Sequence, residues 1–240
     1  MILDLSAKEY KRRVKENSVW FKDTHKVSFD VGQYHGADLV RGDRSPVAMG
    51  NKVYDFMAAA ALGQLAFGRL NTGADGIKLI NGIPVEVEYK FTVINMLDME
   101  VGKQGGISRK SCNTHCSLDA SATAHWVINS DEHLETKNRI TYLIVYDEYL
   151  REFIGAWEMD GDTVYRQLGS DSKKASKRRQ LNWSVFRRLG KQVKLAVPSI
   201  GFAEYEDLIR KHYDWKPYQP TNKSYLKRKA KRLALAQASV

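Results

Sequence analysis

Two acidic residues and a lysine, Asp75, Glu88 and Lys90, lie on apolar segments that are joined by Asn81-Gly82. Asn and Gly best tolerate the positive φ angles of a two-residue type I′ turn, so the pair predicts a β-hairpin. With Asn81 and Gly82 as the turn, Asp75 lies directly opposite Glu88, and opposed residues share one face at about 5 Å. Two such carboxylates repel each other, and a hard cation such as Mg²⁺ relieves the repulsion through oxygen ligands. This chemistry would polarise a phosphate and activate a bound water, which Lys90 could steady.

Residues 85–91 alternate between apolar and charged side chains. A strand has a period of two, so Glu86, Glu88 and Lys90 are expected on one face, with the apolar side chains on the other. The alternative interpretation is an ordinary amphipathic strand whose charges line the solvated face. A register slip of one residue would also move Asp75 to the opposite face.

The order of Asp75, twelve residues and then Glu88-Tyr89-Lys90 resembles the signature of the PD-(D/E)xK nuclease superfamily, which includes restriction enzymes and DNA repair or recombination nucleases. Ala74 replaces the usual proline. The resemblance implies that Asp75, Glu88 and the main-chain carbonyl of Tyr89 bind Mg²⁺, with Mn²⁺ as a substitute, and that Lys90 is the catalytic lysine.

The resemblance extends over about residues 51–157 and implies an α/β fold, a restriction-endonuclease-like core with a mixed central sheet flanked by helices. Apolar spacing predicts helices over 51–70 and 117–126. A continuous apolar run predicts a buried strand over 141–146. Another strand is expected over 151–157, with a turn at 160–162.

Three further residues are candidates for the second tier of the site. Asp55 and Gln64 belong to the predicted helix over 51–70, as in some family members, although Asp55 also suits the first turn of a helix, where the dipole favours acids. Glu86 shares the expected face of Glu88 and would bind a second metal or frame the site.

Positive charge is concentrated at the end of the chain. Residues 1–169 carry 20 Lys or Arg against 23 Asp or Glu, a net charge of −3, whereas residues 170–240 carry 18 against 5, a net charge of +13. Such asymmetry is typical of a nucleic-acid contact. We therefore expect a nuclease core with an N-terminal elaboration over 1–169 and a basic, mostly helical nucleic-acid-binding extension over 170–240, including a helical module near 181–213.

Basic side chains neutralise backbone phosphates without reading sequence. A glycine-rich loop over 101–111 adds three of them beside the expected site. The alternative for the basic run over 227–232 is a solubilising tail or a localisation signal. The predicted nucleic-acid contacts are Lys103, Arg109, Lys110, Lys173, Lys174, Lys177, Arg178, Arg179, Arg187, Arg188 and Lys191.

The sequence argues against a membrane span and against a structural zinc site. The chain has no run of about 18 apolar residues, so no membrane span is expected, and a cytoplasmic or host-cell interior location is the default. Structural zinc is not favoured, because Cys112, His115, Cys116 and His125 do not form two separated ligand pairs.

The sequence thus predicts a Mg²⁺-dependent endonuclease that hydrolyses DNA phosphodiester bonds, with double-stranded DNA as partner. Cleavage of both strands needs two sites, which a homodimer supplies by symmetry. Two alternatives stay open. One is a nucleic-acid-binding protein without catalysis, and the other is the same fold acting on branched DNA or RNA.

Overall fold

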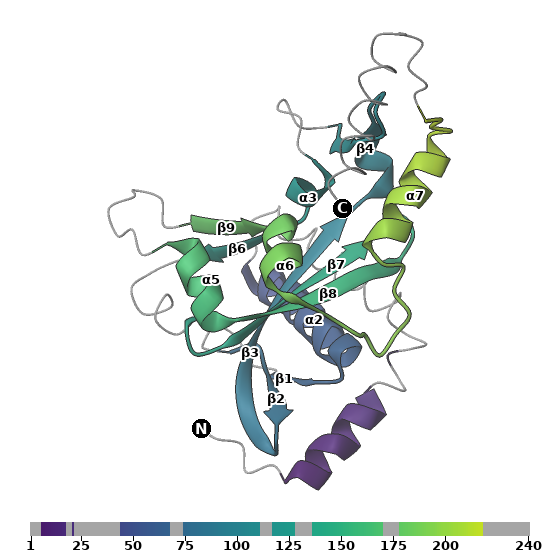
Figure 1. The fold of residues 1–240 in the computed structure, drawn as a ribbon. Helices are drawn as coiled ribbons and strands as arrows, with labels where there is room; N and C mark the ends of the chain where they lie inside the picture. The colour runs from purple at the N-terminus through teal and green to yellow at the C-terminus, as the bar shows by residue number, and fades with distance from the viewer. Residues whose placement is uncertain are drawn as a thin grey trace, which may run out of the picture.

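A six-stranded mixed sheet forms the centre of the computed structural model, which describes residues 6–17, 21, 44–67, 74–110, 117–127, 136–169 and 178–217 (Figure 1). Strands β3 and β7 are parallel and the other neighbours are antiparallel, so the expected α/β fold with a mixed sheet is confirmed. In sheet order the strands are β1 (Leu65–Ala66), β2 (Gly76–Ile80), β3 (Ile83–Ile94), β7 (Ile140–Asp147), β8 (Glu152–Asp160) and β10 (Lys191–Val193).

The predicted hairpin is present in the predicted register. Ile80 lies opposite Ile83, and Asn81 and Gly82 form the turn with φ angles of 53° and 83°. The register then runs without a shift to Gly76 opposite Val87. Because both turn residues adopt positive φ, the local sequence is enough to fix this pairing.

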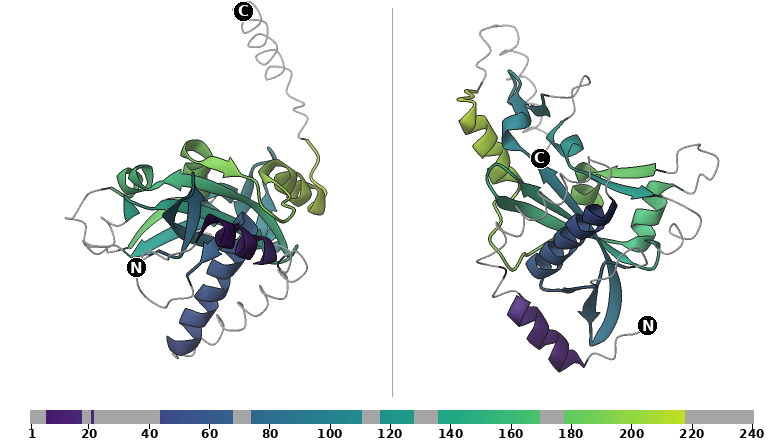
Figure 2. Two further views of the ribbon diagram at one scale, coloured as in Figure 1. Left: turned by 90° about the horizontal axis from the view of Figure 1, so that it is seen from below. Right: turned by 180° about the vertical axis from the view of Figure 1, so that it is seen from behind.

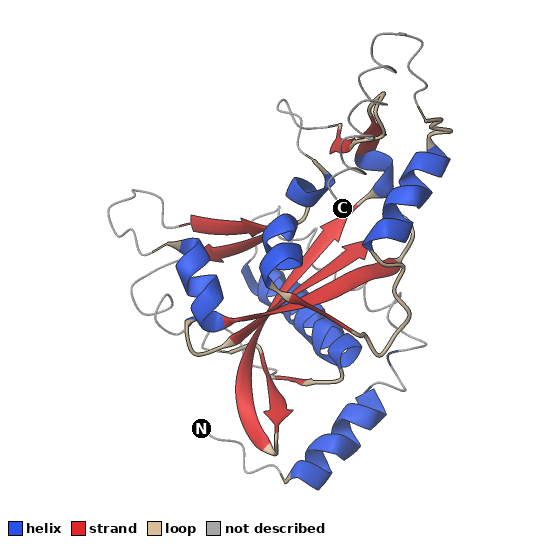
Figure 3. Cartoon of the chain, in the orientation of Figure 1, coloured by secondary structure: helices blue, strands red, loops and turns tan. Residues whose placement is uncertain are grey.

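The two faces of the sheet are covered by different helices. Helix α2 (Arg44–Leu62) packs on one face (Figures 2 and 3). Its buried alanines belong to the same core cluster as apolar side chains of β3 and β7. Helices α5 (Gly161–Leu168), α6 (Trp183–Leu189) and α7 (Phe202–His212) contribute to the core on the other face. Alternate side chains of β3 therefore point to the α2 face, where Val87 and Tyr89 are buried, and to the face of the candidate site, which carries Glu88 and Lys90.

The helix predicted over 51–70 ends earlier than expected. Gly63 follows α2 with a φ of 66°, a left-handed conformation that stops the helix at Leu62. Leu65 and Ala66 then form β1, which pairs with β2. Residues 68–70 lie outside the described residues.

The helix predicted over 117–126 is wrong for most of its length. Only α3 (Leu118–Ser121) is helical, and β6 (Thr123–Val127) pairs antiparallel with β9 (Arg178–Asn182). Ala124 and Trp126 are buried at the period of a strand. The partner strand lies more than fifty residues further along the chain, so local propensity could not reveal it.

The two later strands confirm their predictions. Strand β7 is almost wholly buried, and β8 begins where expected but continues to Asp160. The predicted turn at 160–162 is instead the start of α5, where Asp160 Oδ1 accepts a hydrogen bond from Thr163 N at 2.8 Å. The acid is an N-cap rather than a turn residue.

The predicted basic loop over 101–111 contains short secondary structure. After the 3₁₀ helix η1 (Met96–Asp98), strands β4 (Met99–Val101) and β5 (Ile107–Arg109) form a two-stranded sheet. Residue 111 lies outside the described residues. The basic side chains of this segment are thus attached to a hairpin.

The described part of the basic segment contains the helices α6 and α7 and two short strands, and it packs against the core. Strand β9 pairs with β6, and β10 pairs with β8. Trp183, Phe186 and Tyr205 are buried in the same cluster as β7 and β8. The helical module expected at 181–213 is therefore built into the fold, and residues 170–177 and 218–240 lie outside the described residues.

A helix over residues 7–17 lies beside the β2–β3 hairpin (Figure 1). Tyr10 OH donates to Ile77 O at 3.2 Å. Within the described ranges, no helix combines the length and apolar character needed to cross a bilayer.

Gly161 offers a test of how tightly the start of β7 is held. A Cβ atom at this position would lie 2.7 Å from the carbonyl oxygen of Lys137 and still closer to those of Thr136 and Arg139. We expect Gly161→Ala to lower the free energy of unfolding by about 2 kcal/mol or more, because the backbone cannot move aside cheaply. Urea denaturation measures this. Gly106→Ala is the control, since no described atom lies within 4 Å of its Cβ position, and equal midpoints for the two variants would contradict the expectation.

Candidate active site

Asp75 is fixed at the point where the β2–β3 ladder begins. Its main-chain N–H donates to Val87 O at 3.0 Å, and its side-chain Oδ2 accepts from Tyr89 N at 2.8 Å. The regular pairing of the hairpin ends with Gly76 opposite Val87, and the Asp75 N–H bonds to this same Val87, so the ladder stops there. Asp75 is still near enough to Glu88 for the two charges to interact. The structure therefore brings together the two carboxylates that the sequence predicts as metal ligands.

Lys90 lies beside Glu88 on the same strand. Its Nζ is 2.6 Å from Glu88 Oε1, and both side chains are 19% exposed. The same ammonium lies 5.0 Å from the ring centre of Trp126, which comes from β6. Lys90 is thus placed between a carboxylate and an aromatic ring.

Arg139 is a charged neighbour that sequence reasoning missed. Arg139 immediately precedes β7. Because Thr141 pairs with Glu88 in the parallel ladder, Arg139 lies near Glu86 and Glu88. Its Nε is 3.3 Å from Glu86 Oε2, its Nη1 is 4.0 Å from Glu88 Oε2, and its side chain is only 10% exposed. No local pattern could identify this contact, because it depends on which strand lies next to β3.

Among the predicted catalytic residues, Asp75 has a shifted pKa. Burial raises the pKa of Asp75 to about 7, and the negative charges of Glu88 and then Asp55 add to the rise. The N–H of Tyr89 and the charge of Lys90 act in the opposite direction. At neutral pH Asp75 therefore holds a proton in part of the molecules, and a cation that binds here displaces that proton.

The second-tier candidates take different positions. Asp55, on α2, is near enough for its charge to act on Asp75. Glu86 is exposed and frames the site through Arg139. Gln64 is buried on the α2 face, where its Oε1 accepts from Tyr89 OH at 3.0 Å, so it supports β3 from the side opposite to Glu88.

The donor set suits a hard, partly hydrated cation. Asp75 and Glu88 offer carboxylate oxygens, and Mg²⁺ commonly takes one or two carboxylates while it keeps several waters. Within the described ranges no three Asp, Glu, His or Cys side chains are grouped closely enough to hold an ion by themselves. Asp75 and Glu88 would thus hold an ion only with water in part of its shell, and the Tyr89 carbonyl stays a predicted ligand.

Two buried polar atoms next to these residues lack a hydrogen-bond partner in the described part of the chain. They are Thr141 Oγ1, on the residue paired with Glu88, and Trp126 Nε1, on the ring that contacts Lys90. Buried polar groups normally have partners. Their position on the candidate-site face favours a site that handles polar ligands.

Several predicted phosphate contacts are engaged within the fold. Arg109 lies 3.6 Å from Asp98, and Arg187 Nη1 lies 2.7 Å from Asp119. Lys110 Nζ donates to a main-chain carbonyl of η1 at 2.9 Å. These three side chains would have to give up part of these contacts to bind a phosphate backbone.

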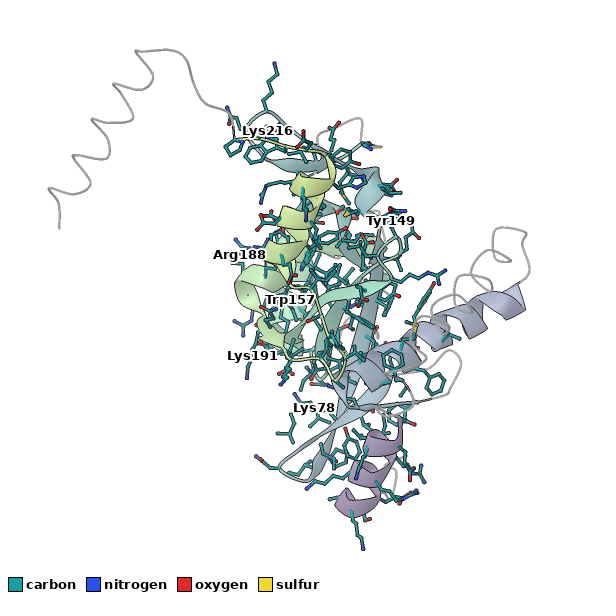
Figure 4. The ribbon with its side chains drawn as sticks, turned by 90° about the vertical axis from the view of Figure 1, so that its right-hand side faces the viewer. Lys78, Tyr149, Trp157, Arg188, Lys191 and Lys216 are labelled. Carbon is teal, nitrogen blue, oxygen red and sulfur yellow. The ribbon has the colours of Figure 1, made fainter. Side chains whose placement is uncertain are left out.

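Arg109, Lys110 and Arg187 are nevertheless exposed, and so are three further predicted contacts. Arg188 and Lys191 lie on the side of the molecule away from α2 (Figure 4), and Lys103 is in the turn between β4 and β5. Arg178 and Arg179 are on β9, and their side chains are outside the described part. The remaining predicted contacts, Lys173, Lys174 and Lys177, also lie outside it, as do three residues considered for zinc, Cys112, His115 and Cys116, and the side chain of His125.

Comparison with known proteins gives no relative for this chain: no protein-family model matches it, and no curated protein matches it.

The raised pKa of Asp75 predicts a pH-dependent stability. The folded-state pKa of about 7 exceeds the ordinary value of 3.8, so the stabilisation is fully present below about pH 4 and is lost as the pH rises through 7. In EDTA, the free energy of unfolding should fall over this range by a few kcal/mol at most. Urea denaturation at a series of pH values measures the slope.

Asp75→Asn should flatten this decline, because an amide does not titrate. Asp214→Asn is the control, since its side chain is 88% exposed, and it should keep the wild-type slope. The same slope in Asp75→Asn and in the wild type would show that Asp75 is not the group responsible.

Proposed function

We propose that this protein is a Mg²⁺-dependent endonuclease with a restriction-endonuclease-like core that hydrolyses DNA phosphodiester bonds. One observation carries the proposal. Asp75, at the end of the hairpin, is held by the Tyr89 N–H within electrostatic range of Glu88, and Lys90 lies on the same strand as Glu88 with its ammonium 2.6 Å from the Glu88 carboxylate.

The arrangement of elements around the site supports this assignment. The chain passes from α2 through the β2–β3 hairpin to β7, which lies parallel to β3 in the middle of the sheet. The helix before the hairpin, the hairpin and the later buried strand are expected around the PD-(D/E)xK signature, whereas the helix expected between β3 and β7 is present only as the short α3. Because both acids and the lysine belong to or adjoin central strands, their positions are held by the sheet rather than by a loop.

Each residue has a role that its position allows. A bound Mg²⁺ would polarise the phosphate and lower the pKa of a water. Asp75 and Glu88 would supply its protein oxygens. Lys90, as a nearby donor, would orient the attacking water or stabilise the charge that develops on the phosphate oxygens.

The exposed basic residues would hold the DNA backbone. Arg188, Lys191 and Lys103 are exposed cations in the described part of the chain, and residues 218–240 carry further positive charge. Such contacts give affinity and salt dependence without sequence preference. A second copy of the chain would supply the second site needed to cut both strands of a duplex.

Plasmid cleavage tests the proposal. Wild-type protein with Mg²⁺ should nick or linearise supercoiled DNA, and Asp75→Asn and Lys90→Gln should each lower the rate by about 100-fold or more, since each removes a group that acts in the transition state. Asp214→Asn and Lys216→Gln are matched controls, because this acid and lysine form an exposed pair with N and O atoms 3.6 Å apart. Both controls should cut at the wild-type rate.

Two other outcomes identify the alternatives. Wild-type protein that retards the plasmid in a gel but leaves it intact with Mg²⁺ or Mn²⁺ would indicate a nucleic-acid-binding protein without catalysis. Cleavage that is restricted to four-way junctions or to RNA in a substrate panel would keep the site and change the substrate.

Lys90 should also compete with the metal for Glu88. Removing the ammonium frees the Oε1 atom that it now binds at 2.6 Å, so Lys90→Gln should bind Mn²⁺ about 2- to 5-fold more tightly than the wild type while it loses activity. Electron paramagnetic resonance of free Mn²⁺ measures the affinity. A weaker affinity in Lys90→Gln would mean that Lys90 supports the metal site instead of competing with the ion.

A further inference from the structure

Trp126 approaches the candidate site from outside the central sheet. It belongs to β6, which crosses over β3, where Thr92 Oγ1 donates to Thr123 O at 3.3 Å. The Trp126 side chain is buried, with 6% exposed, and the Lys90 ammonium lies 5.0 Å from its ring centre. This distance is within the range in which an aromatic face attracts a cation.

Packing alone gives a poor account of a tryptophan at this position. Its indole N–H is buried without an acceptor in the described part of the chain, and a buried, unpaired donor costs free energy. Phenylalanine or leucine would fill a core position without that cost. What indole offers over both is the most attractive aromatic face for a cation.

If Glu88 binds a metal, the Lys90 ammonium requires another group to hold it in the site. In the structure its ammonium occupies Glu88 Oε1, which is one of the oxygens that the proposed metal site requires. When that oxygen turns to the metal, Lys90 loses its ion-pair partner and a long, flexible side chain is free to leave the site. The indole ring of Trp126, whose centre already lies 5.0 Å from the Lys90 ammonium, is the neighbour that can keep it there.

We propose that Trp126 is a positioning residue whose indole face holds the Lys90 ammonium in the site when Glu88 binds the metal. The inference rests on the proposed metal site, and it assigns to β6, an element outside the six-stranded sheet, a part in the placement of Lys90. The benefit is twofold: the lysine stays next to the substrate, and it competes less with the metal for Glu88.

Nuclear magnetic resonance of lysine labelled at Cε tests the placement directly. Protons held over an indole ring are shifted upfield by its ring current, and the Lys90 signal is assigned by its loss in Lys90→Arg. We expect the upfield shift in the metal-free protein and its retention with saturating Mg²⁺. In Trp126→Leu with Mg²⁺ the shift should disappear. Loss of the shift in the wild type when Mg²⁺ binds would overturn the proposal.

A double-mutant cycle on Mn²⁺ affinity separates positioning from a structural role. With Lys90 present, Trp126→Leu should weaken Mn²⁺ binding by about 3- to 10-fold, because the ammonium returns to Glu88. In the Lys90→Gln background the same substitution should change the affinity less than about 2-fold. Equal weakening in both backgrounds would show that Trp126 only supports the fold, and would reject the proposal.

Two further variants serve as controls, one that keeps an aromatic ring at position 126 and one that removes a lysine–aromatic contact elsewhere in the protein. Trp126→Phe keeps an aromatic face and should retain affinity within about 3-fold of the wild type. Tyr213→Leu removes a similar contact elsewhere, where Lys110 Nζ lies 4.8 Å from the Tyr213 ring centre, and should leave Mn²⁺ binding unchanged. If Trp126→Leu does not fold, Trp126→Phe is compared with Lys90 present and in the Lys90→Gln background, and weakening of Mn²⁺ binding by Trp126→Phe in the Lys90→Gln background counts against the proposal.

The outcomes for the two proposals are distinct. A wild-type protein that retains the upfield Lys90 signal with Mg²⁺ but leaves every nucleic acid intact would reject the nuclease and support the role of Trp126. A protein that cuts DNA while the Lys90 signal moves away from the ring would do the reverse. Failure of the wild type to bind either Mg²⁺ or Mn²⁺ would overturn both.

Discussion

Repulsion between Asp75 and Glu88 is the constraint around which the candidate site is arranged. The hairpin brings Asp75 within electrostatic range of Glu88, and the backbone N–H of Tyr89 fixes the Asp75 carboxylate. The protein answers the repulsion in two ways: two cationic side chains lie against Glu88, and burial together with the charge of Glu88 raises the pKa of Asp75 to about 7. Each answer is reversible, since a proton can leave and an ammonium can move. A divalent cation would meet the same electrostatic need.

The sheet and α2 give the site its rigidity. Strand β3 is paired on both sides, antiparallel to β2 and parallel to β7, so Glu88 and Lys90 project from a fixed backbone. Residues 58–61 of α2 are buried alanines, and their small side chains let the helix pack close to the sheet. This close packing brings Asp55 within electrostatic range of Asp75, although the two residues lie on different elements.

Positive charge serves two purposes in the later part of the chain. Arg187 is exposed and forms an ion pair with Asp119, and Arg188 and Lys191 are exposed as well. The strands and helices between residues 178 and 217 also complete the core, because β9 supports β6 and thereby the ring of Trp126 beside Lys90. A segment that composition marks only as basic thus contributes both surface charge and the surroundings of the candidate site.

The sequence by itself determined the features that depend on neighbouring residues. The Asn81-Gly82 turn, the alternation of β3 and the buried run of β7 all follow from local backbone preference and side-chain period, and they were enough to predict the hairpin register from Ile80 opposite Ile83 to Gly76 opposite Val87. Only the tertiary structure decided the position of Arg139, the pairing of β6 with β9 and the placement of Trp126 over Lys90. These contacts join residues distant in the chain, and the free energy of burying β6 against its partner overrode the helical pattern of its own sequence.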